Sequence, residues 1–506
     1  MIEIDVSLTQ KSARDSASHI GGIKMSELTF DRRAVLKGAG AAAVGMSGIV
    51  KAAAGRRRYV NVGVGSRSRM YLTAITKTFA AGNELVAVCD TNQGRLDTAL
   101  NFVKPNLAAA GVKPPKKYLA ADFDKMIKET KPDCVIVTCP DGFHHEYIVR
   151  ALDAGCDVLT EKPLTTTPEK AQAIVDACKR NNRHLRVLFN YRYSPPRTQV
   201  KDLLMSGAIG DVMSVDFHWL LNTLHGADYF RRWHSNKEIS GGLMIHKATH
   251  HFDLVNWWLG SEPELVQAYG KREFYTPKMA KRMGLQSHHE RCLTCPEKDK
   301  CTFYLDIAAD RNFKELYLDN EKYDGYFRDR CVWRPEISIE DTMNVIVKYK
   351  TGATLSYSLN AFNAWEGYTI AFNGTKGRLE HRIVEGGAVS AGATNYQGEE
   401  SDAVSTRIIP LRGKPQVIEP WTGAGGHGGG DNVMLTEVFG TADPDKYKRA
   451  ADERAGLYSC LIGASANKSF VSGAAVRIED LVNGLSSPVV APMPTRDDPV
   501  PMPAKA

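Results

Sequence analysis

Between residues 56 and 190 the chain alternates short apolar runs with amphipathic stretches. The apolar runs, which are rich in β-branched residues and predict strands, lie at 59–62, 84–90, 134–140, 157–163 and 185–190. The stretches 144–155 and 168–182 carry apolar residues at helical spacing and predict helices. Strands that alternate with helices predict an α/β fold built on a parallel, doubly wound sheet.

The second half of the chain has a different pattern. Residues 340–382 alternate apolar and polar positions on both sides of a turn at 350–352, which predicts antiparallel strands. Residues 383–430 are rich in glycine and predict irregular surface loops, whereas residues 449–470 predict a long helix late in the chain. We therefore expect a second, largely antiparallel sheet after the parallel one.

The composition is that of a globular protein. The chain has 506 residues, of which 43% are hydrophobic and 24% are charged, enough for two or three domains with large cores. Its apolar runs stay short of the roughly 18–20 residues that a membrane span needs. The net charge is +7, and residues 1–58 alone hold ten Lys/Arg against five Asp/Glu, so the remainder is nearly neutral. This balance predicts neither a nucleic-acid partner nor binding to an anionic membrane.

The basic N-terminal segment has the layout of an export signal. Arg32 and Arg33 precede a weakly apolar stretch rich in Gly and Ala, and a small-residue site at 52–54 follows. This arrangement resembles a Tat signal, with Met25 as a candidate true start. We interpret residues 1–54 as this signal, and we expect a bacterial periplasmic or exported protein that the Tat machinery carries in folded form with its cofactor bound.

A glycine-rich turn follows the first predicted strand. Gly63-x-Gly65-x-x-Ser68 stands between the strand at 59–62 and a helical pattern, which is the context of a dinucleotide-binding (Rossmann) turn. Gly63 permits the tight turn, and Gly65 lets the backbone approach a pyrophosphate at the helix N-terminus. Ser68 stands where a third glycine is usual.

The second predicted strand ends in an acid, Asp90, which lies 27 residues after Gly63. A carboxylate at this place binds the ribose hydroxyls of NAD and repels the 2′-phosphate of NADP. Arg95 lies close by in the sequence, so NADP stays open as an alternative. The sequence predicts NAD as the cofactor.

Several motifs together resemble the Gfo/Idh/MocA family of sugar oxidoreductases. They are Glu161-Lys162-Pro163 at a strand end, TCPDGFHHE at 138–146, FNYRYSP at 189–195, GGLMIHKATHHFDLVNWWLG at 241–260 and GGHGGGD at 425–431. The resemblance implies an N-terminal Rossmann domain (55–190) and a C-terminal α/β domain (191–485) with an open, mainly antiparallel sheet. It also implies a homodimer or homotetramer formed through that sheet. We expect the Pro-rich tail at 486–506 to be extended.

The resemblance assigns the catalytic groups. By it, Lys162 hydrogen-bonds the reacting hydroxyl beside the nicotinamide, where burial lowers its pKa because desolvation disfavours the ammonium ion. His250 matches the family's catalytic histidine and is expected to act as acid/base. His246 stands where the family has aspartate and, four residues before His250, is expected on the same helix face. Lys247 is a further catalytic candidate, and its charge opposes metal binding at this histidine pair. His251 is expected to be structural.

The remaining site candidates form two groups. The cofactor-binding group is Gly63, Gly65, Ser66, Arg67, Asp90, Pro140, His144, Glu161 and Lys162. Aromatic and hydroxyl-binding polar groups suit a carbohydrate substrate. The substrate group is Arg192, Tyr193, Trp233, His234, Asp253 and His427.

Four of the ten cysteines form a separate group in a charged, aromatic-rich insert at about 275–335. Cys292, Cys295, Cys301 and Cys331 have the spacing C-x2-C-x5-C-x29-C. Four thiolates suit a structural Zn²⁺ ion, two disulfides suit an oxidising periplasm, and unlinked thiols or a cluster are the third interpretation. We expect these cysteines, joined by zinc or by disulfides, to hold a long loop in place near the active site.

Three functions are compatible with these residues. The first, which we favour, is an exported NAD(P)-dependent oxidoreductase that takes hydride from a sugar or glycoside and keeps its cofactor bound and internally recycled. The second is an NAD-dependent glycoside hydrolase that oxidises C3 transiently, eliminates the glycosidic bond, adds water and re-reduces the product. The third is a non-catalytic sugar-binding protein, against which the presence of Lys162 and His250 argues.

Overall fold

The computed structural model describes residues 55–385, 403–423, 425–494 and 496–503. The predicted export signal at 1–54 lies outside these residues, and so does part of the glycine-rich segment. Among the described residues, no helix combines the length and the apolar character that crossing a membrane requires.

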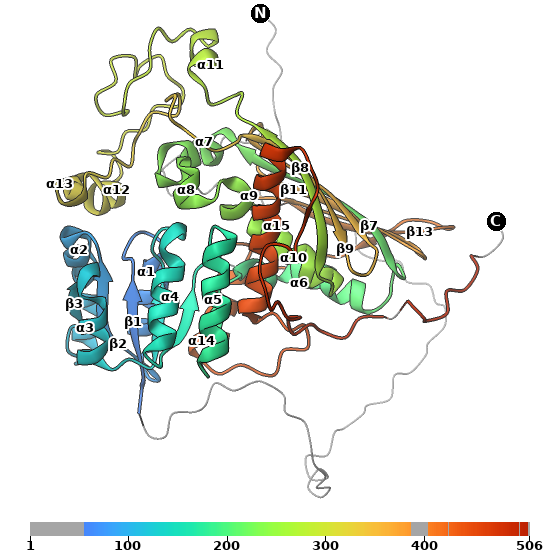
Figure 1. The fold of residues 1–506 in the computed structure, drawn as a ribbon, viewed down its shortest axis with the longest axis horizontal. Coiled ribbons are helices and arrows are strands. Elements are labelled where there is room, and N and C mark those ends of the chain that lie inside the picture. Colours follow the sequence, from blue (N-terminus) through green and yellow to red (C-terminus); the bar gives the residue numbers. More distant parts are fainter. Residues whose placement is uncertain (1–54, 386–402, 424, 495, 504–506) are drawn as a thin grey trace, which may run out of the picture. The chain divides into compact units, whose positions relative to one another are not determined.

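A seven-stranded sheet forms the N-terminal domain (Figure 1). Its strands are β1 (Arg57–Val62), β2 (Asn83–Asp90), β3 (Lys116–Leu119), β4 (Cys134–Val137), β5 (Asp157–Thr160), β6 (Leu185–Val187) and the late β15 (Ala451–Asp452). The order is β15-β6-β5-β4-β1-β2-β3, with β1 to β6 parallel and β15 antiparallel at the edge. The predicted parallel, doubly wound sheet is confirmed. Its strand order reverses between β1 and β4, where such sheets bind ligands.

Local signals in the sequence set where the helices of this domain begin. The main helices are α1 (Ser68–Thr73), α2 (Gln93–Ala109), α3 (Phe123–Thr130), α4 (His144–Asp153) and α5 (Pro168–Arg180). Asn92 caps α2 and Thr167 caps α5, each through a side-chain oxygen that accepts a backbone N–H. After β1 the chain turns at Gly63 with φ +83°, where a Cβ would lie 2.5 Å from Cys139 N, so only glycine fits this turn.

The C-terminal domain is built on a nine-stranded sheet of order β14-β13-β12-β11-β7-β10-β9-β8-β16. Its strands are β7 (Val212–Asn222), β8 (Pro263–Lys271), β9 (Thr342–Tyr349), β10 (Thr354–Asn363), β11 (Gly367–Gly374), β12 (Gly377–Val384), β13 (Val404–Pro410), β14 (Gln416–Ile418) and β16 (Val476–Arg477). Neighbouring strands are antiparallel except β7 and β10. The expected mainly antiparallel sheet is confirmed, including the hairpin of β9 and β10 across the predicted turn.

The prediction of irregular loops at 383–430 is wrong for part of that segment. Strand β13 pairs with β12, and β14 pairs with β13, so the segment extends the sheet by two strands. Along β13, Thr406 and Ile408 are buried while Ser405 and Arg407 are exposed. A short edge strand depends on its neighbour for its structure, and the glycine content around it concealed this alternation.

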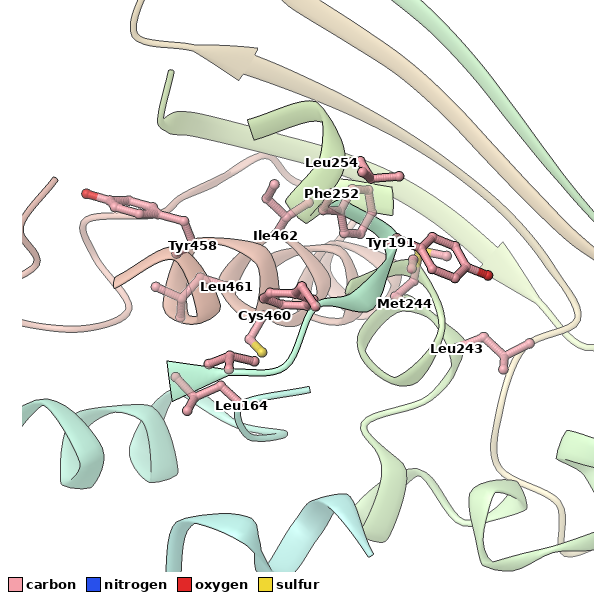
Figure 2. Packing of buried hydrophobic residues seen from close by; sticks show 14 of the residues in the cluster. Leu164, Tyr191, Leu243, Met244, Phe252, Leu254, Tyr458, Cys460, Leu461 and Ile462 are labelled. Carbon is pink, nitrogen blue, oxygen red and sulfur yellow. The ribbon is translucent and has the colours of Figure 1, made fainter. Parts of the chain in front are cut away.

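A helical layer joins the two sheets. Its helices are α6 (Pro195–Met205), α7 (Thr223–Arg231), α8 (Lys237–Ser240), α9 (Leu243–His246), α10 (Ala248–Leu259), α14 (Gly430–Phe439) and α15 (Glu453–Ser472). Figure 2 shows Cys460 of α15 beside Leu164, which follows β5, and Phe252 of α10 on the other side of α15. At its other end α15 reaches β8, where Ser469 Oγ accepts a hydrogen bond from Ala268 N at 2.9 Å. Helices α9 and α10, which carry the predicted catalytic histidines, pack against α15, and α15 contacts both sheets.

The insert at about 275–335 docks on the edge of the N-terminal domain (Figure 1). It contains the short helices α11 (Pro277–Arg282), α12 (Arg311–Leu316) and α13 (Glu321–Asp324). Asp324 pairs with Arg95, and Asn320 O accepts a hydrogen bond from Asn92 Nδ2 at 3.0 Å. The insert therefore lies beside the start of α2, next to the carboxyl end of β2.

The described part of the Pro-rich tail contains neither helix nor strand, as expected for an extended segment. It runs against its own C-terminal domain. Lys201 Nζ of α6 donates to Met493 Sδ at 3.0 Å, and Arg496 Nη2 donates to Val212 O of β7 at 3.0 Å.

Candidate active site

Three loops meet at the carboxyl ends of β1, β4 and β5, where the strand order of the first sheet reverses. They carry Gly63 after β1, Asp141 after β4, and Glu161 with Lys162 after β5. Helix α9 of the C-terminal domain faces them, since Lys162 Nζ lies 3.5 Å from His246 Nε2. The candidate site therefore lies where the two domains meet.

Glu161 organises the cofactor side of the site. Its Oε1 accepts hydrogen bonds from Arg67 Nε and Tyr71 OH, each at 2.5 Å, and its Oε2 accepts one from Lys162 N at 3.2 Å. Burial alone would raise the pKa of this carboxyl, but the charges of Arg67 and Lys162 outweigh burial and lower the pKa. Glu161 is thus an anion that positions both Arg67 and the backbone of Lys162.

Lys162 is half-buried and reaches towards α9. Its Nζ donates to His246 O at 3.2 Å and lies 3.5 Å from His246 Nε2. Burial lowers the pKa of the ammonium group to about 8, against the opposing charges of Asp141 and Glu161, and the nearby charge of Lys247 adds to the lowering. This direction is the one expected from the sequence for a buried lysine at this position. An amine that titrates near neutrality can both take and give a proton.

His246 is bound to a carboxyl group from the other domain. Its Nδ1 lies 2.5 Å from Asp141 Oδ2, and Asp141 is buried in the loop after β4. The two histidines expected on one helix face belong to two successive helices, because His246 ends α9 and His250 lies in α10. The interruption falls at Lys247, where His250 N bonds to the carbonyl three residues back, at 3.3 Å, in a tighter turn.

His250 stacks on the ring of Tyr191, with centroids 4.1 Å apart and planes at 15°. The imidazole is buried, and its Nδ1 has no hydrogen-bond partner among the described residues. Burial, together with the charges of Lys162 and Lys247, holds the pKa of His250 well below its usual value. A neutral imidazole with an unoccupied nitrogen can accept a proton, which is what the predicted acid/base role requires.

Lys247 contacts the aromatic rings of Tyr191 and Trp219. Its Nζ donates to Tyr191 OH at 3.3 Å and lies 4.4 Å from the ring centroid of Trp219, and burial lowers its pKa. His251 packs against the C-terminal sheet. Its Nδ1 lies 2.7 Å from Tyr357 OH and its ring stacks on Trp219 at 4.0 Å, in keeping with the structural role expected for it.

The turn after β1 fits a dinucleotide. Nothing lies within 4 Å of the place a Cβ would take at Gly65, so this backbone is open to a phosphate. Ser66 is exposed beside it, and Arg67 follows at the start of α1. Pro140 is half-buried in the loop after β4 at the same edge of the sheet. These residues, with Gly63, would hold the pyrophosphate and nicotinamide halves of NAD.

Asp90 is held in place at the end of β2. Its carboxylate accepts hydrogen bonds from Val64 N at 2.8 Å and from Asn92 N at 2.9 Å. Arg95, the residue that left NADP open, pairs with both Asp90 and Asp324. These two carboxylates therefore already pair with the guanidinium of Arg95.

His144 has no ring nitrogen left for a ligand. Its Nδ1 lies 2.8 Å from Pro163 O and its Nε2 lies 2.9 Å from Cys139 O. The ring is buried between the loops after β4 and β5 and ties them together. His144 therefore supports the cofactor edge through the backbone of these loops.

Three predicted substrate residues are engaged with other protein side chains. Arg192 and Asp253 form a buried bidentate ion pair, with N–O distances of 2.7 and 2.6 Å, in which the two charges neutralise each other. Tyr193 OH accepts a hydrogen bond at 2.5 Å from Arg186, which lies in β6 of the N-terminal domain. The physical reason is the 3-10 turn at 190–193, which directs Tyr191 into the site and the two residues after it elsewhere.

The other three predicted substrate residues lie around the histidines. Trp233 stacks on His234 at 3.5 Å, and the His234 ring meets His246 edge-on at 4.1 Å. His427 is exposed, with its ring 5.7 Å from that of Tyr191. Together they border the space next to the catalytic candidates.

Sequence reasoning missed several residues of this site. Asp141 and Tyr191 lie inside motifs that carry the family resemblance, so the signal was present, but a motif does not tell which side chains face inward. Arg197, whose guanidinium lies 4.1 Å from the Tyr191 ring centroid, and its partner Glu385 had no signal in the sequence. Asp431, which pairs with His427, belongs to the glycine-rich motif.

The four insert cysteines line one cavity together with Arg231. An antiparallel bridge between Arg291 and Arg330 sets Cys292 beside Cys331, and Arg231 Nη1 donates to Cys292 Sγ at 3.2 Å. All four are free thiols, and within the described ranges no three His, Cys, Asp or Glu side chains are arranged as metal ligands. Zinc and disulfides both stay predictions.

A Rossmann sheet joined to an antiparallel α/β domain, with lysine and histidine side chains at their junction, is the architecture of a two-domain dinucleotide-binding oxidoreductase. Residues 57–189 match the family model described as the NAD-binding Rossmann fold of an oxidoreductase family, and residues 201–478 match its C-terminal alpha/beta domain. The chain belongs to the Gfo/Idh/MocA family, which confirms the resemblance seen in the sequence.

Individual relatives agree with this. YteT of Bacillus subtilis (strain 168), named as an oxidoreductase, is 35% identical over 434 residues, which cover 84% of this chain and 98% of that protein. D-glucoside 3-dehydrogenase of Escherichia coli (strain K12) is 30% identical over 204 residues, 40% of this chain and 54% of that protein. A solved levoglucosan dehydrogenase in complex with NADH has a TM-score of 0.55 at 17% identity, covering 84% of this chain and 99% of that chain, and shows the shared fold.

Proposed function

We propose that this protein is an NAD(P)-dependent oxidoreductase that takes hydride from a sugar or glycoside. The observation that carries the proposal is the contact of Lys162 with His246 at the end of β5, beside the glycine turn of a dinucleotide fold. Homologues named as glucoside, inositol and levoglucosan dehydrogenases support a carbohydrate substrate. The pairing of Arg95 with two carboxylates supports NAD over NADP.

Each side chain has a task in such a reaction. Lys162 orients the reacting hydroxyl and, as the amine, takes its proton. When bound, NAD supplies the hydride acceptor. Glu161 and Arg67 position the loop beside the cofactor, and His250 is a second group able to hold a proton next to the substrate. Trp233 offers an aromatic face to the sugar.

We also propose that the protein works outside the cytoplasm with its cofactor held in place. The twin arginines at Arg32 and Arg33 support export. No free NAD pool exists there, so the bound cofactor must be reset within the site, for example by reducing a second sugar. We further propose a homodimer or homotetramer through the C-terminal sheet, whose outer face exposes Tyr269 and Ile346.

One observation favours a second candidate, the redox-neutral glycoside hydrolase. The site holds more proton-transfer groups than a single hydride step needs, because Asp141, His246, Lys247 and His250 gather around Lys162. Elimination of a glycosidic bond requires a second proton transfer besides the one from the oxidised hydroxyl. These groups can supply it.

The test starts from protein purified without added cofactor. Bound nucleotide is released by denaturation and identified by mass, and the native protein is incubated with a panel of free sugars and p-nitrophenyl glycosides. A sugar-dependent absorbance change at 340 nm supports the oxidoreductase. Nitrophenol release without net NADH supports the hydrolase. Absence of nucleotide binding, with and without added NAD(P), contradicts both.

A further inference from the structure

A chain of three polar side chains links the two domains at the candidate site. Asp141 Oδ2 lies 2.5 Å from His246 Nδ1, and His246 Nε2 lies 3.5 Å from Lys162 Nζ. We propose that Asp141 and His246 form a proton relay that acts through Lys162 and switches it between ammonium and amine without exchanging charge with solvent. This inference rests on the proposed hydride transfer and deepens it. Asp141 and His246 are positioning residues, because they act on the substrate only through Lys162.

The geometry determines which atom carries each proton. Lys162 Nζ also donates to His246 O at 3.2 Å, which keeps the amine on the Nε2 side of the imidazole. An ammonium group has only donors, so His246 Nε2 accepts from it. The single proton of the neutral imidazole then sits on Nδ1 and is donated to the Asp141 carboxylate.

The relay step is balanced. One proton moves from Lys162 Nζ to His246 Nε2 while another moves from His246 Nδ1 to Asp141 Oδ2. Lys162 becomes an amine, His246 takes its other neutral tautomer, and Asp141 becomes a carboxylic acid. The net charge of the three groups is zero before and after. The amine then accepts the proton of the sugar hydroxyl as hydride leaves the carbon that bears it.

Burial narrows the free-energy difference between the two states of the relay. It raises the pKa of Asp141 well above its usual value and lowers that of Lys162, so the buried ion pair loses its advantage over the neutral pair. Burial, with the charges of Lys162 and Arg232, also holds the pKa of His246 well below its usual value. The imidazole therefore passes protons without persisting as a cation.

The surroundings leave Asp141 as the carboxyl group placed to receive the proton. The charged and titratable groups that face His246 and Lys162 are Asp141, Glu161, Arg67, Arg232, Lys247, His225, Tyr229, His234 and His250. Glu161 is already occupied by Arg67 and Tyr71. Where the family has an aspartate, this chain has His246. The carboxylate of Asp141, from the Rossmann domain, is hydrogen-bonded to this histidine.

The first test does not depend on activity. Acetic anhydride labels only the amine form of a lysine, so the labelling of Lys162 against pH, read by mass spectrometry on the full-length protein, gives its titration midpoint. We expect a midpoint near pH 8 in the unmodified sequence. Asp141→Asn removes the charge that stabilises the ammonium and should lower the midpoint. Asp124→Asn, an exposed carboxyl on α3, is the matched control and should leave it unchanged. An Asp141→Asn midpoint equal to that of the control overturns the relay.

The second test asks whether more than one proton moves in the step that sets the rate. With a glycoside that the protein oxidises, the single-turnover rate in mixtures of H₂O and D₂O should curve for the wild type and become linear for His246→Gln, because a glutamine amide can hydrogen-bond both neighbours but does not pass a proton. The rate should fall at least ~100-fold with KM little changed. His218→Gln, exposed on β7, is the control.

The outcomes separate two failures. A linear dependence in the wild type overturns the relay while leaving the oxidoreductase intact. No change at 340 nm in the wild type with any sugar overturns the proposed function, and the labelling midpoint of Asp141→Asn still decides the relay.

Discussion

The imidazole of His250 lies flat on the phenol ring of Tyr191, with 4.1 Å between the ring centroids, while Lys247 Nζ reaches the hydroxyl of the same tyrosine at 3.3 Å. Tyr191 therefore supports two of the catalytic candidates, Lys247 at the break between α9 and α10 and His250 within α10. This contact helps to bury His250, and burial together with the charges of Lys162 and Lys247 holds its pKa well below the usual value.

His250→Ala should lower the rate of hydride transfer at least ~100-fold, because it removes the group that holds a proton beside the substrate. His250→Phe separates this role from packing, since a phenyl ring can keep the stack on Tyr191 but cannot take a proton. Stopped-flow absorbance at 340 nm measures both variants. Near wild-type turnover of the phenylalanine variant would assign His250 to packing alone.

Lys162→Ala should abolish hydride transfer and leave the dinucleotide bound. Lys162→Arg should be almost as inactive, because guanidinium keeps the positive charge but does not become a base near neutral pH. Binding of NAD is followed by quenching of protein fluorescence, and turnover is followed at 340 nm. If the arginine variant retains most of the rate, the positive charge and not the amine is what the reaction needs.

Asp90→Ala should weaken NAD binding about tenfold, which corresponds to the loss of roughly 1.5 kcal/mol from a hydrogen bond to a charged group. NADP binding should weaken less, since its 2′-phosphate gains from the removal of the carboxylate and the release of Arg95. Dissociation constants for both nucleotides give the ratio. Asp97→Asn, exposed on α2, is the control. An unchanged ratio would remove Asp90 from the choice of cofactor.

Asp228 should make the fold sensitive to acid. Burial would raise the pKa of this carboxyl, but Arg232 at 3.0 Å and Arg328 of the insert at 2.7 Å lower it to about 2. Since this folded value lies below the unfolded one of about 3.9, the stabilisation is complete above pH ~4 and is lost as the pH falls through 2. Asp228→Asn should cost at least about 2 kcal/mol in free energy of unfolding at pH 7 and much less at pH 2.5.

Urea denaturation at the two pH values measures this difference. Asp319→Asn, an exposed carboxyl in the insert, is the control and should change little at either pH. A cost for Asp228→Asn that stays the same at both pH values would show that packing and not charge is responsible.

Cys331→Ser should loosen the insert and weaken NAD binding severalfold, because the insert holds Arg95 through Asp324 beside the cofactor edge. Cys178→Ser, on α5 and outside the insert, should not. Metal analysis and thiol titration of the wild type then separate the two interpretations. Zinc predicts one metal ion per chain and four thiols that react only after chelation, whereas disulfides predict four fewer thiols until reductant is added.

Much of the cofactor side could be predicted from the sequence. Gly63 follows a predicted strand, and Asp90 and Lys162 lie at the ends of predicted strands. Because the ends of parallel strands share one edge of a sheet, local pattern was enough to bring them together. The substrate side was predicted less well. Arg192 and Asp253 have the polarity of sugar-binding residues, and nothing in their sequence context shows that they neutralise each other in the core.

By itself, the sequence determined the two kinds of sheet, the dinucleotide turn and the family, because these depend on periodicity and on motifs within short segments. Only the tertiary structure decided that Asp141 stands behind His246, that Tyr191 and not Tyr193 enters the site, and that Asp324 occupies Arg95. These contacts join residues far apart in the chain. The protonation and role of a buried polar group depend on what surrounds it in space, and no local pattern specifies those surroundings.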